Sequence, residues 1–409
     1  MYPELFDFEK EASKVNVSLS SNLNVDLETR YDKGFSRVIT ESGSYKVALI
    51  KDLFSKDNYV LQPDYQRRKT WSDKKKSKLI ESFIINIPIP PIFIYEYEYD
   101  KYEVMDGLQR LSSIIDFYGD KFVLSGLEEW SDLNGKHYSE LPEKIREGID
   151  RRQLQVITVL KESAANDPNR ADQIKRLVFE RLNTGGIKLT GQEVRNATLH
   201  GPGNKLCLEL SESKVFRTLW GIPSNIEKNY SLFEDSYESE NDNIYSQDLF
   251  DDIEKNLLYR RMGDVELVLR FFAMRYINDF NYGLIKFLDD TLVKLNSFSE
   301  KDLNELKNVF IFALNNANVM FGENAFKYYR ENKWSKPAKM IYDPLLLVLS
   351  QRDIKVKSSN IDSNINKLKE FYVGLNIDDP ELFNGKHQRK ENILNRASKF
   401  DAFIREKIV

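Results

Sequence analysis

YEVMDGLQRLSSIIDFYG, residues 102–119, is the stretch of the sequence that decides the fold. Its first four residues are typical of a short strand, and Leu108, Leu111 and Ile115 then recur at helical spacing. The strand therefore runs almost directly into a helix at the intervening Asp-Gly pair. Arg110 falls in the first turn of that helix, where the helix dipole disfavours a cation unless an anion lies beside it.

The sequence leaves two explanations of this junction open. Asp106 as the N-cap residue and Gln109 three positions later would form a capping box, which needs no ligand. Gly107 at the first helical position costs about 1 kcal/mol relative to alanine, but it allows a ligand to approach the backbone closely. With Arg110 and the N–H groups of the first turn, the same residues suit a phosphate.

Hydrophobic patterning divides the chain. Strand-like and helix-like stretches alternate from about residue 45 to residue 200, which indicates a mixed α/β core. Thr190 and Glu193 are spaced as a capping box within it. The later apolar spacing is mostly helical. The sequence predicts the α+β class, with an N-terminal extension over 1–44, an α/β domain over 45–222, an acidic linker over 223–256 and an all-helical domain over 257–409.

Composition excludes several classes of protein. The 409 residues carry a net charge of −4, so no global field draws the chain to DNA or to a membrane. Cys207 is the single cysteine, which excludes an intramolecular disulfide, and we expect it to be a small buried apolar residue. The most apolar run, residues 83–95, is interrupted by prolines and is too short to span a bilayer. We expect a cytoplasmic protein.

Two further stretches contain candidate ligand residues. YQRRKTW, residues 65–71, places basic side chains between two aromatic ones, which suits a phosphate pocket or a nucleic-acid groove, or else a solvated basic loop. FERLNTGGIKLTGQEVRNA, residues 179–197, combines arginine, asparagine and glycine, although its glycines also suit a simple helix stop. The candidates in these stretches are Gln66, Arg67, Arg68, Arg181, Asn183, Gly186, Arg195 and Asn196.

The motifs PDYQRRKTW, YEVMDGLQRL and FERLNTGGIKLTGQEVRNA, in this order and spacing, resemble the N-terminal domain of GmrSD-type modification-dependent restriction systems. The resemblance covers residues 45–200, and RMGDVELVLRFF, from residue 261, resembles the helical extension of single-domain members. It implies a fold similar to ParB and sulfiredoxin. It also implies binding of nucleoside triphosphates and, in several members, their hydrolysis to control nucleic-acid processing in phage defence. The usual signature is Asp-Gly-Gln-Gln-Arg, from which Leu108 departs.

From this resemblance we expect a nucleoside triphosphate-binding regulator with Mg²⁺-dependent triphosphatase activity. Gly107, Gln109 and Arg110 would hold phosphate oxygens. Asp106 would cap the helix, bind Mg²⁺ or position water, and the sequence does not decide between these roles. The expected catalytic residues are Asp106, Gln109 and Arg110, and the expected nucleotide ligands are Gly107 and the eight candidates of the two further stretches.

Two other functions fit the same residues. A ParB-like DNA-binding or DNA-nicking protein would use this surface as a basic groove. A scaffold or toxin-like component would act through a partner protein of its operon. The candidate partners are therefore a nucleoside triphosphate, DNA, a separate nuclease and a second copy of the chain in a homodimer. No GxxxxGK[ST] motif occurs, and nothing after residue 260 resembles the His-Asn-His nuclease domain of full-length relatives.

Overall fold

The computed structural model describes ten segments of the chain: residues 4–14, 38–60, 71–164, 168–182, 190–223, 255–281, 283–354, 360–379, 381–383 and 389–408. The chain divides into two compact units. We call Ser21–Leu189 with Asn196–Thr198 the α/β unit. Met1–Ser20, Thr190–Arg195 and Leu199–Val409 form the helical unit.

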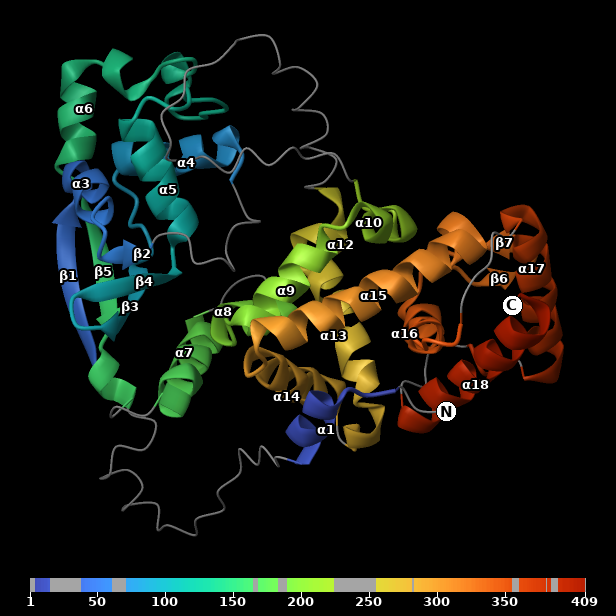
Figure 1. Cartoon of the computed structure of the whole chain (residues 1–409). Helices are drawn as coiled ribbons and strands as arrows, with labels where there is room; N and C mark the ends of the chain where they lie inside the picture. The colour runs from blue at the N-terminus through green and yellow to red at the C-terminus, as the bar shows by residue number, and fades with distance from the viewer. Residues whose placement is uncertain are drawn as a thin grey trace. The chain divides into compact units, whose positions relative to one another are not determined.

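The α/β unit is built on a five-stranded mixed sheet with the order β1-β5-β3-β4-β2 (Figure 1). β1 is antiparallel to β5, β5 is parallel to β3, β3 is antiparallel to β4, and β4 is parallel to β2. The strands are β1 (Thr40–Lys46), β2 (Tyr59–Val60), β3 (Ile92–Glu98), β4 (Lys101–Asp106) and β5 (Gln153–Val159).

Alternate residues of the central strands face opposite sides of this sheet. Ile94 and Val156 belong to the larger core, which apolar residues of four helices complete. Tyr95 and Val159 face the other way and pack with Ile174 in a smaller core. The helices of the larger core are α3 (Ile50–Phe54), α4 (Asp73–Ile84), α5 (Leu108–Tyr118) and α6 (Glu143–Asp150), and the smaller core is covered by α7 (Pro168–Leu182).

The helical unit has one continuous core. Its central helix, α13 (Gly263–Arg275), is buried around nearly its whole circumference. The other helices are α1 (Asp7–Lys14), α9 (Pro202–Ser211), α10 (Lys214–Trp220), α12 (Leu257–Arg260), α14 (Leu284–Asn296), α15 (Glu300–Phe321), α16 (Lys339–Leu349), α17 (Ile361–Asp378) and α18 (Lys390–Lys407). A hairpin of β6 (Tyr329–Arg330) and β7 (Lys333–Trp334) interrupts the otherwise helical order, which the sequence did not predict.

The α+β class is confirmed, but the units divide at a different point from the expected one. The sequence predicts one domain over 45–222, whereas α9 and α10 belong to the helical unit, because Leu206 and Phe216 enter its core. β1 begins inside the expected extension of 1–44, at Thr40. Most of the expected acidic linker, residues 224–254, lies outside the described residues.

Three smaller predictions can be checked. Thr190 and Glu193 form the expected capping box at the start of α8 (Gly191–Thr198). Cys207 is fully buried, and this burial raises the pKa of its thiol. In the described part of the chain, every helix is too short or too polar to span a membrane.

Candidate functional site

The junction between β4 and α5 lies at the end of the β3–β4 hairpin. β4 ends at Asp106 and α5 begins at Leu108, with Gly107 between them in the left-handed region at φ 94°. A Cβ atom at position 107 would lie 2.4 Å from Cδ1 of Ile92. The turn itself therefore requires glycine, for both its backbone angle and the space around it.

Arg110 has its own partners in this turn. Its Nη2 donates a hydrogen bond to Oδ2 of Asp106 over 2.6 Å, and its Nη1 donates to the carbonyl oxygens of Pro90 and Pro91, the latter over 3.1 Å. The Arg110 side chain is 12% exposed and that of Asp106 is 42% exposed. The Asp106 carboxylate thus supplies the negative charge that an arginine needs in the first turn of a helix.

The capping box that the sequence left open for Asp106 and Gln109 is absent. Gly107 is the N-cap residue of α5, and no side chain caps this helix. The left-handed glycine moves Asp106 one position further from the helix, where its carboxylate meets Arg110. Oε1 of Gln109 instead accepts a hydrogen bond of 2.9 Å from the backbone N–H of Trp71.

This bond connects two of the sequence motifs. Trp71 is the last residue of the basic stretch and the one that the structure describes, and Gln109 lies in the first turn of α5. The hydrogen-bond ladder of α5 begins where the Leu111 N–H donates to the Gly107 carbonyl over 3.0 Å. As at any helix start, the N–H groups before Leu111 lie outside this ladder, at the positive end of the helix dipole. Among the candidates, Gln66, Arg67, Arg68, Asn183 and Gly186 lie outside the described residues.

Arg195 has a structural environment in the helical unit. Its side chain is 2% exposed and pairs with Asp289 over 2.7 Å and with Glu266 over 3.4 Å. Its guanidinium also donates to the carbonyl oxygen of Ile285. Two carboxylates therefore already balance the charge of Arg195.

The other described candidates differ in exposure. Asn196 is buried, whereas Arg181, on α7, is exposed. Leu108, where the family signature has glutamine, is 5% exposed and packs in the larger core, so this position favours an apolar side chain. Pro90 and Pro91 are partners of Arg110 that the sequence does not predict. A proline-rich extended segment was visible there, but not which helix its carbonyl groups would meet.

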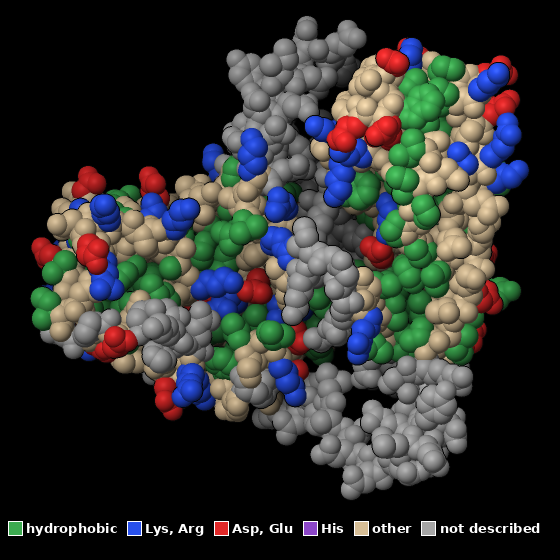
Figure 2. Space-filling model, turned by 180° about the vertical axis from the view of Figure 1, so that it is seen from behind, with side chains coloured by type: hydrophobic (Ala, Val, Ile, Leu, Met, Phe, Trp, Pro, Cys, Tyr) green, Lys and Arg blue, Asp and Glu red, His purple; other side chains and the backbone are tan. Residues whose placement is uncertain are grey.

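Charges of both signs occur together on the surface. On the face drawn in Figure 2, the described Lys and Arg side chains are interspersed with Asp and Glu side chains. This agrees with 60 basic and 64 acidic residues in the chain. Duplex DNA is typically bound by a basic patch or stripe, and the described side chains of this face do not form one.

Together, the helix-covered mixed sheet and the strand-glycine-helix junction define an α/β domain with a candidate anion site at the start of α5. Residues 50–200 match the family model of the GmrSD restriction endonuclease, N-terminal domain. This match confirms the identification made from the three motifs, so the segment is a GmrSD-type N-terminal domain. A domain of this type indicates that the protein is a component of a restriction system. No curated protein and no solved structure matches the chain. The similarity to ParB and sulfiredoxin stays a prediction.

Proposed function

We propose that the α/β unit binds a nucleoside triphosphate with Mg²⁺ at the β4–α5 junction, and that this binding regulates a restriction system. The observation that carries the proposal is the hydrogen bond from Trp71 to Gln109. It ties the end of the basic stretch to the first turn of α5. In the sequence, Arg67, Arg68 and Lys69 come shortly before Trp71, and cationic side chains together with helix N–H groups suit a phosphate.

The junction offers two kinds of donor to a phosphate. The first are the N–H groups at the start of α5, beside Gly107, whose lack of a side chain allows a ligand to approach the backbone. The second belong to Arg110, whose guanidinium has five N–H donors. Three of its hydrogen bonds stay within the protein, to Asp106, Pro90 and Pro91. In this proposal Arg110 both fixes the turn and presents its remaining donors to the ligand.

Asp106 is the proposed magnesium ligand. Its Oδ2 accepts from Arg110, and its Oδ1 accepts no hydrogen bond from the described residues. Mg²⁺ in nucleotide sites is commonly held by one or two carboxylates together with the phosphates. Asp106 would therefore hold the ion that accompanies the triphosphate, and the ion would reduce charge repulsion at the phosphoryl group.

We extend this proposal to slow hydrolysis of the triphosphate. Arg110, held next to Asp106, would stabilise charge on the phosphoryl group as it is transferred. Gln109, whose amide oxygen is used by Trp71, would position the basic stretch. The nucleotide and its turnover would then control a nuclease activity elsewhere in the system.

Calorimetric titration of the full chain with ATP, GTP, CTP and UTP tests the proposal, each with Mg²⁺ and with a chelator. Binding of at least one nucleotide, dependent on Mg²⁺, is the expected result. Asp106→Asn should weaken it about 10- to 100-fold, because a bond to a charged group contributes about 1.5–3 kcal/mol. No heat and no thermal stabilisation with any of the four would contradict the proposal.

Asp116→Asn is the matched control. Asp116 lies on α5, in the last half of the helix that follows Asp106, and pairs with Lys76 over 3.0 Å, so the substitution removes the same charge at a position away from the junction. Nucleotide affinity should stay within about twofold of the wild-type value, since an ion pair of this kind contributes little beyond its own site. An equal loss in both variants would show that the effect comes from general destabilisation.

A further inference from the structure

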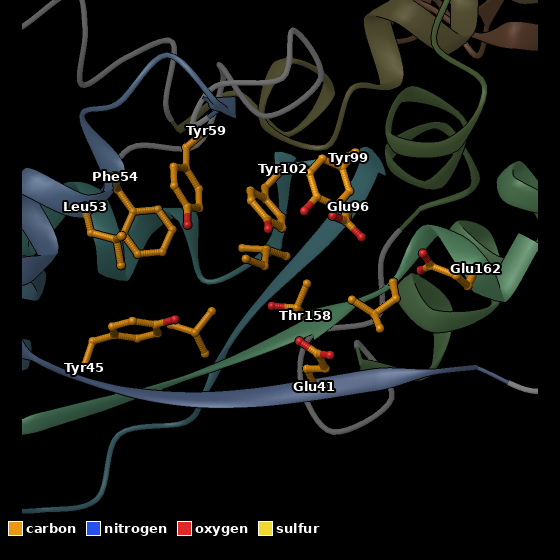
Figure 3. Close-up of a pocket in the computed structure, with 13 residues that line it drawn as sticks. Glu41, Tyr45, Leu53, Phe54, Tyr59, Glu96, Tyr99, Tyr102, Thr158 and Glu162 are labelled. Atoms are coloured by element: carbon orange, nitrogen blue, oxygen red, sulfur yellow. The ribbon is translucent and has the colours of Figure 1, made fainter.

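A hollow lies on the α/β unit, away from the junction. It has a volume of about 330 Å³, and its walls come from β1, α3, β2, β3, β4 and β5 (Figure 3). Tyr102 lines it, whereas Asp106 is at the other end of β4. The four residue steps from Tyr102 to Asp106 span about 13 Å of strand. The thirteen lining residues are Glu41, Tyr45, Leu53, Phe54, Tyr59, Ile94, Glu96, Tyr99, Tyr102, Val156, Thr158, Leu160 and Glu162.

Aromatic rings form one side of the hollow. The ring of Tyr59 lies 4.8 Å from that of Phe54 and is stacked 5.0 Å from that of Tyr102. Figure 3 shows the hydroxyl groups of Tyr59 and Tyr102 directed into the space above Tyr45. Burial and the neighbouring Tyr102 raise the pKa of Tyr59 to about 12. These hydroxyl groups are therefore protonated at neutral pH and can accept hydrogen bonds through their oxygen atoms.

Carboxylates form the other side. Glu41, Glu96 and Glu162 line the hollow, and the described lining includes no lysine or arginine. Figure 3 shows these three carboxylates gathered on the side of Thr158. Lys161 lies over the ring of Tyr99, 5.5 Å from its centroid, and forms no ion pair with the lining glutamates.

Glu96 is a largely buried carboxylate of this hollow. It is 7% exposed, and the one hydrogen bond to its carboxylate comes from the N–H of Asp100 to Oε1, over 3.2 Å. Among the described residues no cation pairs with it, and its Oε2 accepts no hydrogen bond. Oε2 is not one of the enclosed polar atoms of the described residues, so it is open to the hollow that Glu96 lines. A cation placed in the hollow would find this oxygen without a competing ion pair.

We propose that this hollow binds a linear organic polycation, a diamine or polyamine. Ammonium groups would pair with the glutamates, starting with Glu96, and the alkyl chain would lie against the tyrosine rings. Aromatic faces attract ammonium groups as well as alkyl chains, so the tyrosine wall and the carboxylates favour the same kind of ligand. The hollow is large enough for such a compound, since its volume is within the usual range of small-molecule pockets.

Calorimetric titration of the full chain with putrescine and spermidine tests this proposal. The matched ligand control is 1,4-butanediol, which has the same carbon chain as putrescine without its charges. Saturable binding of at least one amine, and none of the diol, is the expected result. Equal binding of the diol would overturn the proposal, and so would the absence of binding by both amines. Displacement of a bound amine by an equal concentration of Mg²⁺ would also overturn it, because the hollow would then be a metal site.

Substitutions locate the ligand. Glu96→Gln keeps the shape and the bond from Asp100 but removes the charge, and should weaken amine binding about tenfold or more. Glu162→Gln, at an exposed position, should weaken amine binding several-fold. It replaces Glu96→Gln as the test variant if Glu96→Gln does not fold. The control is Glu98→Gln, which removes an exposed charge two residues away that pairs with Lys101. An unchanged affinity in both pocket variants, or an equal loss in the control, would overturn the assignment.

The outcome is independent of the nucleotide proposal. Asp106→Asn removes a carboxylate of the junction and should leave amine affinity unchanged. Glu96→Gln should leave nucleotide affinity unchanged. Either site can therefore fail its test while the other one passes.

Discussion

Arg110→Ala should lower the stability of the α/β unit even in the absence of any ligand. The substitution removes the hydrogen bonds from the guanidinium to the carbonyl oxygens of Pro90 and Pro91 and to the carboxylate of Asp106. A hydrogen bond to a charged group contributes about 1.5–3 kcal/mol when buried. Pro90 is exposed and Asp106 is half-exposed, so water replaces part of what is lost.

We therefore expect a loss of about 2 kcal/mol, close to the lower end of that range. For a unit of this size it corresponds to a fall of about 4–8 °C in Tm. Denaturant unfolding monitored by circular dichroism and tryptophan fluorescence measures it. Arg110→Lys should lose most of the same stability, because the single ammonium group of lysine cannot reproduce the planar guanidinium that donates to oxygen atoms of Pro90, Pro91 and Asp106.

Arg151→Ala is the control for this experiment. Arg151 pairs with Glu147 on α6 of the same unit, but both side chains are more than half exposed. Its removal should change the free energy of unfolding by less than about 0.5 kcal/mol. Equal stability of Arg110→Ala and the wild type would refute the structural role of the hydrogen bonds from Arg110 to Asp106, Pro90 and Pro91.

Three further predictions concern single residues. Gly107→Ala should cost more than about 1 kcal/mol in denaturant unfolding, because of the positive φ and the contact with Ile92, and unchanged stability would contradict the turn geometry. Arg195→Ala should destabilise the helical unit by about 3–5 kcal/mol, because it removes the buried cation that pairs with Asp289 and Glu266, yet the nucleotide affinity of the folded fraction should stay the same. Tyr59→Phe should reduce the loss of stability between pH 10 and 12. The pKa of Tyr59 is raised to about 12 in the folded protein, from an ordinary value of 10.0. Between these two values the unfolded chain loses the proton and the folded protein keeps it, so the free energy of unfolding falls as the pH rises through this window. Equal pH dependence in both proteins would contradict this assignment.

The fold class could be predicted because it depends on local patterns. Alternating apolar residues mark β5, and the spacing of Leu108, Leu111 and Ile115 marks α5. The unit boundary could not be predicted in the same way. α9 and α10 are amphipathic, but periodicity does not tell which of two cores an apolar face will enter, and Leu206 and Phe216 enter the helical one.

The candidate site was predictable only in part. The motif residues around Gly107 were found, but the φ angle of this glycine was not, and that angle rules out the capping box. The two carbonyl partners of Arg110, on Pro90 and Pro91, lie about twenty residues earlier, so finding them requires the pairing of β3 with β4. The hollow draws Glu41 and Glu96 from separate strands, and only the sheet order brings them to one cavity.

Hydrogen exchange of the full chain, followed by mass spectrometry with and without a triphosphate and Mg²⁺, tests the central claim most directly. Peptides that cover Trp71 and residues 102–112 should exchange more slowly with nucleotide, because the ligand would engage the N–H groups at the start of α5. Peptides from α15 in the helical unit serve as the internal reference. Slowed exchange confined to the helical unit, or unchanged exchange at residues 102–112 with all four nucleotides, would contradict a nucleotide site at this junction.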